Sequence, residues 1–237
     1  MLCEDTRHTR KLLDRHDVRA RLVSYHEHNE AKRTAEFLPR LEAGERVALV
    51  SDAGLPGISD PGARLIAAAL EAGVEVTVLP GPSAVETALV ASGLVAGRYQ
   101  FLGYLPRSER ALQALAEEVA RWPDAAVAFE SPQRLAASLR VLARVIPDRE
   151  AAVCRELTKR FEEVRRGSLA ELAKGTGEVK GEITLVIGAA EAAGPDESSA
   201  IAGVDELVAA GVPRRQAADV VSRLTGAARN RLYRGSL

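Results

Sequence analysis

From residue 47 onward, short apolar runs alternate with amphipathic stretches. This order is typical of βαβ units around a mainly parallel sheet, so the expected fold class is α/β. Residues 47–50 are apolar without interruption, which predicts a strand buried on both faces. Farther on, Asp60 and Pro61 precede an apolar stretch that ends at Gly73. We therefore expect a helix over 63–72 with Asp60 as its N-cap and Pro61 at its first position.

The same alternation continues to residue 187. Valine alternates with polar residues over 74–79, which predicts a strand, and Ser83 can cap a helix that runs to residue 92. Further strands are expected at 99–103, 125–129, 151–155, 161–166 and 183–187, and further helices at 110–121, 134–145 and 169–173.

The tail differs from the rest of the chain in its charge. Residues 191–210 contain five acidic residues and no lysine or arginine, whereas residues 211–237 contain six arginines and one aspartate. Two short helices are predicted there, at 204–210 and 216–224, after a linker of small and polar residues. We divide the chain into an N-terminal α/β domain (1–104), a C-terminal α/β domain (105–190), and an acidic linker with a basic helical tail (191–237).

Composition narrows the class of protein. With 237 residues, 46% hydrophobic and 27% charged, and a net charge of −1, the chain can fill a core and is unlike a disordered or uniformly basic protein. Its apolar run at 183–190 is far shorter than the ~20 residues of a membrane span, and residues 1–7 do not resemble a secretory or transit peptide. We expect a cytoplasmic protein without a membrane partner. Two cysteines are too few for a disulfide framework or a structural zinc site.

Two loops are candidate ligand sites, because each follows a predicted strand and open α/β sheets bind ligands at the carboxyl ends of their strands. They are residues 51–62 and 80–84. Glycines there let the backbone approach a ligand, and Asp52 can accept hydrogen bonds. The same residues also suit ordinary structural turns. The chain has neither the G-x-G-x-x-G nor the G-x-x-x-x-G-K-[ST] motif, which disfavours a Rossmann dehydrogenase and a P-loop enzyme.

The histidines and one charged run raise further alternatives. His26 and His28 share a face if their segment is extended and could then bind a metal. A third ligand is not evident, so a polar loop or an RNA-contacting segment is favoured and no metal is expected. The charged run at 155–163 is equally consistent with a solvated loop of ion pairs.

Taken together, the motifs resemble the tetrapyrrole methylase superfamily of S-adenosylmethionine-dependent methyltransferases. Within it they are most similar to the bacterial subfamily that methylates the ribose 2′-oxygen of a cytidine in 16S ribosomal RNA. The matching stretches are Glu4-Asp5-Thr6-Arg7, 25–29, Ser51-Asp52-Ala53-Gly54 with 58–62, 80–84, 101–106, Glu130-Ser131-Pro132 with Arg134, 155–159 with Phe161-Glu162-Glu163, Lys180-Gly181-Glu182, and in the tail Leu224-Thr225-Gly226 and Asn230 before Leu232-Tyr233.

The resemblance implies a two-domain α/β fold with a cofactor cleft between the domains and a small helical C-terminal extension. Members usually begin with a strand and a Pro-Ile-Gly-Asn loop about 30 residues before the Glu-Asp-Thr-Arg motif. We therefore expect this chain to lack that first strand. By the resemblance, S-adenosylmethionine contacts Asp52, Ala53, Gly54, Leu55, Pro80, Gly81, Ser83, Ala84, Phe129 and Ile183.

The implied substrate also suggests catalytic residues. A ribose 2′-hydroxyl is a poor nucleophile at neutral pH, so its proton must be removed while its oxygen is held in line with the methyl group. Lys159 is the candidate base, provided that burial lowers its pKa, and Glu130 and Glu156 are alternatives.

The implied partners are 16S rRNA or the 30S subunit, and a second copy of the chain in a homodimer. Clustered arginines in the tail can contact phosphates, although a helical pair that packs a dimer explains them equally well. Candidate RNA contacts are Arg7, His26, His28, Arg155, Arg214, Arg215 and Arg229. Two other functions stay open: carbon methylation of a tetrapyrrole such as a precorrin, and RNA binding without turnover.

Overall fold

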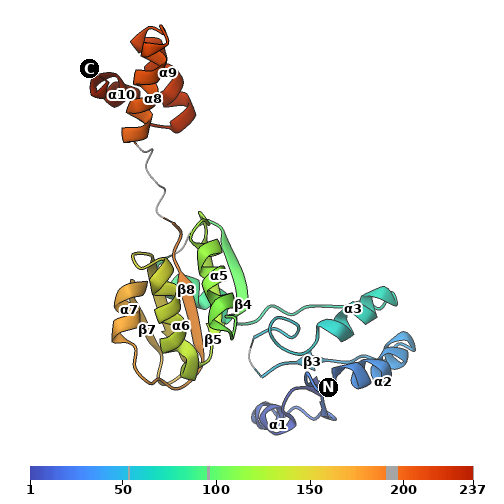
Figure 1. Cartoon of the computed structure of the whole chain (residues 1–237). Helices are drawn as coiled ribbons and strands as arrows, with labels where there is room; N and C mark the ends of the chain where they lie inside the picture. The colour runs from blue at the N-terminus through green and yellow to red at the C-terminus, as the bar shows by residue number, and fades with distance from the viewer. Residues whose placement is uncertain (53, 95–96, 191–196, 237) are drawn as a thin grey trace.

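The computed structural model describes residues 1–52, 54–94, 97–190 and 197–236, which form two sheets with their helices and a group of C-terminal helices (Figure 1). The first sheet is parallel, with strand order β2-β1-β3. Its elements are β1 (Leu2–Cys3), α1 (Thr6–Arg15), β2 (Val23–Ser24), α2 (Glu30–Glu42), β3 (Leu49–Val50) and α3 (Ala63–Glu71).

A small core holds this first unit together. Leu2, Tyr25, Phe37 and Leu65 are buried against one another, and α2 packs beside α3. The Tyr25 hydroxyl lies 3.1 Å from Glu30 Oε1 and 3.2 Å from Thr34 Oγ1, so its polar end is satisfied inside the core. Burial raises the pKa of Tyr25 to about 12.

The second sheet has the order β4-β5-β8-β6-β7. Only β4 and β5 pair in parallel, and the other three pairings are antiparallel, so the prediction of a mainly parallel sheet is wrong for this part of the chain. The reason is the place of β8. Both β5 and β6 run antiparallel to β8, and therefore parallel to each other, but β8 is inserted between them. The elements are α4 (Ala84–Ser92), β4 (Tyr99–Tyr104), α5 (Glu109–Val119), β5 (Ala125–Glu130), α6 (Pro132–Val145), β6 (Glu150–Arg155), β7 (Glu163–Ser168), α7 (Leu169–Gly175) and β8 (Ile183–Ile187).

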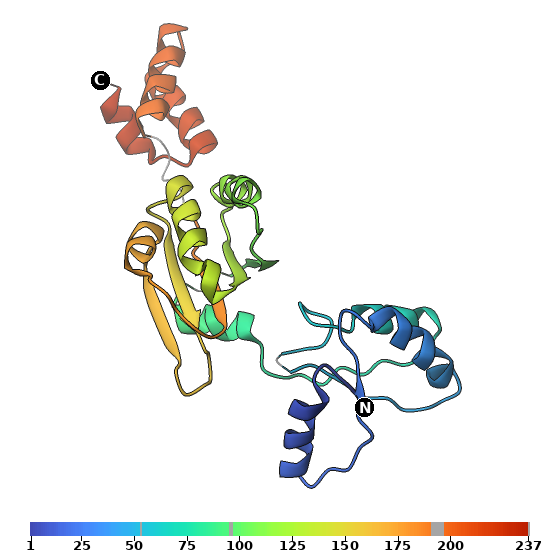
Figure 2. The same cartoon turned by 60° about the horizontal axis from the view of Figure 1, so that its bottom comes forward.

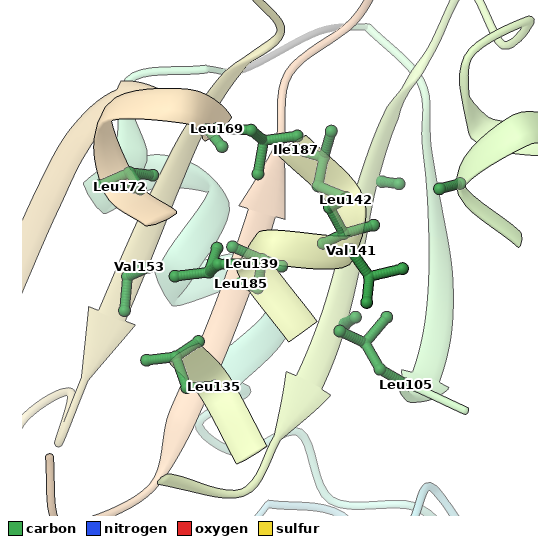
Figure 3. Close-up of a cluster of buried hydrophobic side chains, with 14 of the residues drawn as sticks. Leu105, Leu135, Leu139, Val141, Leu142, Val153, Leu169, Leu172, Leu185 and Ile187 are labelled. Atoms are coloured by element: carbon green, nitrogen blue, oxygen red, sulfur yellow. The ribbon is translucent and has the colours of Figure 1, made fainter. Parts of the chain in front are cut away.

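Helices cover both faces of this sheet. Along β5, Ala126 and Ala128 face a cluster formed with α5, α6 and α7, whereas Ala125 and Val127 face a second cluster formed with α4. Leucines of α6 fill the centre of the first cluster (Figure 3). Because successive strand residues point to opposite faces, burial on both sides explains why these strands are apolar without alternation.

Three predictions for the first unit are wrong in detail. Residues 74–79 form no strand, although their alternation suits one. The strand predicted at 47–50 is shorter, and its residues are half-buried or exposed because β3 lies at the edge of the sheet. Helix α3 has Gly62 as its N-cap instead of Asp60, and Pro61 precedes the helix.

Helix α4 and strand β4 lie before the predicted domain boundary at residue 104, yet they belong to the second sheet. Helix α4 packs on β6 and β8, and β4 pairs with β5. The domain boundaries stay a prediction, and these contacts favour a first boundary within 74–83.

The C-terminal helices α8 (Glu197–Ala209), α9 (Arg214–Thr225) and α10 (Arg229–Gly235) pack on one another (Figure 2). Their buried residues form a separate cluster that includes Val204, Ala217, Val221 and Leu232. Both predicted tail helices are confirmed, but α8 begins seven residues earlier than expected, so residues 197–203 are not a linker. The rest of the predicted linker, 191–196, lies outside the described residues. Among the described helices, none combines the length and apolar character needed to cross a bilayer.

Candidate functional site

The candidate residues of the second unit gather where β5 and β6 end and β8 begins. Glu130, the last residue of β5, is paired with Ile183, and Ile183 is paired on its other side with Arg155, the last residue of β6. Insertion of β8 between β5 and β6 thus brings together strand ends that are far apart in the sequence. The loop that follows β6 carries Glu156 and Lys159.

Lys159 lies in a charged cluster at this sheet end. Its Nζ is 2.7 Å from Glu182 Oε1 and 3.1 Å from Glu156 Oε1, and its side chain is 43% exposed. Partial burial lowers the pKa of Lys159, but the hydrogen bonds to Glu182 and Glu156 outweigh that effect and raise it above the ordinary lysine value. The premise that burial lowers this pKa is therefore wrong. Lys159 is a cation at neutral pH and has no free base to offer.

Glu156 is held by the same cluster. Its Oε1 accepts the backbone N–H of Glu182 at 2.9 Å and the ammonium of Lys159. These bonds, the backbone one foremost, lower the pKa of Glu156, which makes it a weak base. The contact requires glycine at 181, because a Cβ there would lie 2.5 Å from Glu156 Cγ and the backbone has φ = +98°.

Glu130 does not join this cluster. Its carboxylate is fully buried on the α6 side of the sheet. There it accepts the Ser131 N–H and the Ser138 hydroxyl and lies 3.1 Å from Arg134 Nη2. The same Arg134 nitrogen donates to the carbonyl oxygens of Leu105 at 3.0 Å and Pro106 at 2.7 Å. Through Arg134, this arrangement clamps the loop after β4 to the start of α6. The role of the Glu130 carboxylate is therefore structural.

In the first unit, residues 51–62 follow β3 as predicted. Gly62 has φ = +145°, and a Cβ there would lie 2.9 Å from Leu49 Cδ2, so only glycine fits. Its N–H donates to Glu30 Oε1 at 3.0 Å, and the Arg64 N–H donates to the same atom at 3.4 Å. Glu30 of α2 therefore caps α3 across the unit and fixes the end of the loop.

Carboxylates converge around this loop. Asp52 lies 3.9 Å from His8 Nδ1, and its side chain is 29% exposed. Burial raises the pKa of Asp60, and the nearby charges of Glu4, Asp52 and Glu182 raise it further. Glu182 belongs to the second unit, so its charge acts on the Asp60 carboxyl of the first unit.

The other predicted cofactor residues lie on three segments. Pro80 and Gly81 are exposed, and Ser83 and Ala84 are the N-cap and first residue of α4. The Ser83 hydroxyl donates to Glu86 instead of capping the helix. Gly54 accepts a hydrogen bond from Ser51 Oγ and has φ = +77°, and Leu55 is half-buried beside it. Ala53 lies outside the described residues.

Phe129 forms an aromatic cluster at the end of β5. Its ring lies 5.0 Å from that of Phe101 and 5.6 Å from that of Tyr104, both edge to face. Tyr104 is exposed and offers a flat surface beside Phe129.

Outside the tail, two of the candidate RNA contacts already form ion pairs within the protein. Arg7 is paired with Asp5 but remains 88% exposed, and Arg155 is paired with Glu163 at 3.0 Å. The histidines lie before and within a turn rather than on an extended strand, so the proposed shared strand face is absent. Asn29 Nδ2 lies 3.0 Å from His26 Nε2. Within the described part of the chain, no group of three or more histidine, cysteine or carboxylate side chains is arranged to hold a metal.

In the tail, Arg214 donates to the Ser236 hydroxyl and Arg229 is paired with Asp219. Arg215 is exposed on α9, and Arg223 and Arg234 are exposed as well. These three side chains carry the positive charge that is most available to a phosphate.

Neither of two cavities is lined by a predicted cofactor residue, although the second includes His8, the neighbour of Asp52. One of about 770 Å³ is lined by residues of 41–47 and 72–77, and one of about 420 Å³ by Asp5, Arg7, His8 and Lys11. The cofactor cleft between the domains stays a prediction.

Three residues near the candidate site were not identified as site residues from the sequence. Asp60 lies in the candidate ligand loop 51–62 and is also expected to cap a helix, and Tyr104 and Glu182 lie in matching motif stretches, but none of the three is named there as a site residue. Tyr104 and Glu182 lie next to predicted strands, and this position could have marked them as site residues. The pKa of Asp60 is raised by residues distant in sequence, so the sequence gives no indication of it.

The sequence matches the family of Tetrapyrrole (Corrin/Porphyrin) Methylases over residues 2–173. A protein of Mycobacterium tuberculosis (strain H37Rv) named ribosomal RNA small subunit methyltransferase I is 49% identical over 97% of this chain and 82% of its own length. A protein of the same name from Micromonospora olivasterospora is 44% identical over 97% of this chain and 75% of its own length. The crystal structure of uroporphyrin-III C-methyl transferase from Thermus thermophilus, complexed with S-adenyl homocysteine, superposes with a TM-score of 0.52 at 18% identity. It covers 72% of this chain and 78% of its own, and shows a common fold.

The Glu130 clamp makes a prediction about stability. Glu130→Ala leaves the Arg134 guanidinium and the Ser138 hydroxyl without their buried acceptor, and we expect it to lower the free energy of unfolding by about 3 kcal/mol. Urea unfolding followed by the fluorescence of Trp122, the single tryptophan, which packs on the same core, measures this. The control Glu117→Ala, on exposed α5 surface, changes stability by less than about 0.5 kcal/mol. Unchanged stability in Glu130→Ala would refute the clamp.

Proposed function

The chain belongs to the tetrapyrrole (corrin/porphyrin) methylase family, and we propose that it is an S-adenosylmethionine-dependent enzyme that methylates the ribose 2′-oxygen of a cytidine in 16S rRNA. The observation that carries this proposal is the 44–49% identity, over 97% of the chain, to relatives named ribosomal RNA small subunit methyltransferase I. The exposed arginines of the tail support it, because they suit a large anionic substrate.

The residues at the two facing loops fit the cofactor. Its sulfonium and amino groups are cationic, and the carboxylates of Asp52 and Asp60 with Glu182 nearby provide a negative environment for them. Gly54 lets the backbone approach a flat ligand, and Phe129 with Tyr104 offers aromatic surface. Asp52, Gly54, Leu55 and Ile183 are therefore our first cofactor contacts, with Ala53, Pro80, Gly81, Ser83 and Ala84 as further ones. S-adenosylmethionine, when bound, supplies an activated methyl group.

The protein's own task is to hold the ribose oxygen in line with that methyl group. Correct orientation alone contributes several kcal/mol, up to about 7–11 in well-oriented systems. Lys159 lies at the sheet end as a fixed cation paired with Glu156 and Glu182, so its contribution is to hold these two carboxylates in place. Glu156 is also at this end and is the remaining carboxylate candidate for the proton, whereas Glu130 is enclosed by α6.

We place the RNA on the basic surfaces of Arg7, Arg155 and the tail, with His26 and His28 at its margin. Arg214, Arg215 and Arg229 are contributed by the C-terminal helices. We further propose that the enzyme acts in the cytoplasm as a homodimer on rRNA or the assembled 30S subunit.

A transfer assay tests the proposed function and the role of Asp52 together. With labelled S-adenosylmethionine and unmodified 30S subunits, we expect label in 16S rRNA within a dinucleotide that resists alkaline cleavage, because a methylated 2′-oxygen cannot attack its phosphate. In calorimetry, Asp52→Ala should weaken S-adenosylmethionine binding about 10- to 100-fold, since a hydrogen bond to a charged group contributes about 1.5–3 kcal/mol.

The control for binding is Glu71→Ala, which removes an exposed acid at the end of α3. Label on a base carbon, or transfer to a tetrapyrrole in place of rRNA, would contradict the proposed reaction. Undiminished affinity in Asp52→Ala would remove Asp52 from the cofactor site.

Two substitutions distinguish a fixed charge from a base at position 159. Lys159→Arg keeps the cation but cannot take a proton, whereas Lys159→Met removes the charge. At saturating substrates we expect the arginine variant to keep turnover within about tenfold of wild type and the methionine variant to lose more. If Lys159 is the base, both variants lose about 100-fold or more.

The tail arginines predict a salt-dependent contribution to RNA binding. Replacing Arg215, Arg223 and Arg234 together by glutamine should reduce the slope of log K against log salt by about 2, because each neutralised phosphate contributes about 0.7–0.9. Arg144→Gln, an exposed arginine of α6 paired with Glu109, is the control. An unchanged slope, with a monomer in place of a dimer, would assign the tail to subunit packing.

A further inference from the structure

An exposed aromatic ring lies at the end of the second sheet where β4 and β5 finish. The chain is poor in aromatic residues, at 4%, yet Phe101, Phe129 and Tyr104 form one cluster whose neighbouring rings meet edge to face. Phe101 and Phe129 are half-buried and pack on the core formed with α4, whereas Tyr104 is 63% exposed. Tyr104 is thus the outer member of the cluster, and much of its ring is open to a ligand.

A shift in strand register turns Tyr104 toward this cluster. Phe101 is paired with Val127 and Tyr104 with Phe129, so β4 has one residue more than β5 over this stretch. Without the extra residue, the alternation of side chains along a strand would place Tyr104 on the opposite face of the sheet from Phe101. Register shifts of this kind re-aim side chains and are frequent next to active sites.

The backbone around Tyr104 is also fixed. The Leu105 N–H donates to the Phe129 carbonyl oxygen at 3.1 Å, and the Leu105 side chain is buried. Arg134 Nη2 donates to the carbonyl oxygens of Leu105 and Pro106. A tyrosine held in this way loses little conformational entropy when a ligand stacks on its ring, so the arrangement favours binding.

Two exposed arginines follow Tyr104 in the chain. Arg107 and Arg110 form no ion pair within the residues that the structure describes. The acidic residue between them, Glu109, is paired with Arg144 of α6 and does not neutralise them. An aromatic ring for stacking next to cations that contact phosphates is the usual means by which proteins bind unpaired nucleic acid. The neighbourhood of Tyr104 therefore suits an RNA base.

We propose that Tyr104 stacks on the base of the nucleotide that is methylated. This inference rests on the proposed function and adds to it the residue that holds the base, which orients the attached ribose. The adenine of the cofactor is the other planar ring available. Tyr104 lies on the edge strand β4, however, one strand farther from Ile183 than Phe129. We therefore assign Phe129 to the cofactor and Tyr104 to the RNA.

A binding experiment tests stacking without methyl transfer. The probe is single-stranded oligocytidylate of about ten nucleotides that contains one pyrrolocytidine, whose fluorescence falls when its ring stacks. Tyr104→Leu keeps the apolar bulk but not the flat ring, and we expect it to weaken binding about 10- to 100-fold and to abolish the quenching. The matched control Tyr104→Phe keeps the ring and should bind within about threefold of wild type.

A second experiment separates the RNA from the cofactor. With 30S subunits as substrate, Tyr104→Leu should lower kcat/KM for the subunits about tenfold or more, while its S-adenosylmethionine affinity in calorimetry stays within about twofold of wild type. Urea unfolding followed by Trp122 fluorescence checks that both variants are folded. If the wild-type protein binds and quenches the oligonucleotide but methylates no 30S subunits, that result counts against the proposed function alone.

Three results would overturn the proposal. They are equal quenching by Tyr104→Leu and wild type, equal losses in Tyr104→Leu and Tyr104→Phe, and a loss of cofactor affinity with unchanged RNA binding. The second would assign a hydrogen bond to the Tyr104 hydroxyl in place of stacking by its ring. The third would assign the ring to the adenine of the cofactor.

Discussion

Insertion of β8 between β5 and β6 is the constraint on which the second half of the molecule depends. Its antiparallel pairing on both sides aligns Ile183 with Glu130 and with Arg155. The residues just before β8 therefore meet the loop that follows β6, which is why Glu182 and Lys159 are in contact. A last strand placed at either edge of the sheet would leave the same residues on separate surfaces. The candidate chemistry thus follows from strand order.

The packing explains how this sheet tolerates helices on both faces. Its central strands are rich in alanine, and α6 supplies large leucines to one face while α4 covers the other. Small strand residues allow a helix to approach closely, and large helix residues then fill the space. Glu130 ends this apolar strand as a buried carboxylate, and the clamp through Arg134 makes its burial tolerable.

Charge is used differently at the two carboxylate clusters. Around Lys159, carboxylates raise the pKa of an amine that is partly exposed, so the cluster stays charged at neutral pH. Around Asp60, burial and the like charges of nearby carboxylates raise the pKa of the carboxyl, which favours its neutral form.

The sequence by itself determined most of the helices and strands beyond residue 83, since long periodic segments and buried apolar runs leave few alternatives, and its motifs identified the family. It did not indicate α1, α2 or α10, whose apolar positions are few. It was misleading at 74–79, where the pattern suits a strand but these residues pair with no strand in the part of the chain that the structure describes. Only the tertiary structure decided the direction of strand pairing, the burial of Glu130 and the raised pKa of Lys159. Each of these depends on which distant segments become neighbours, and a pattern of residues along the chain does not contain that information.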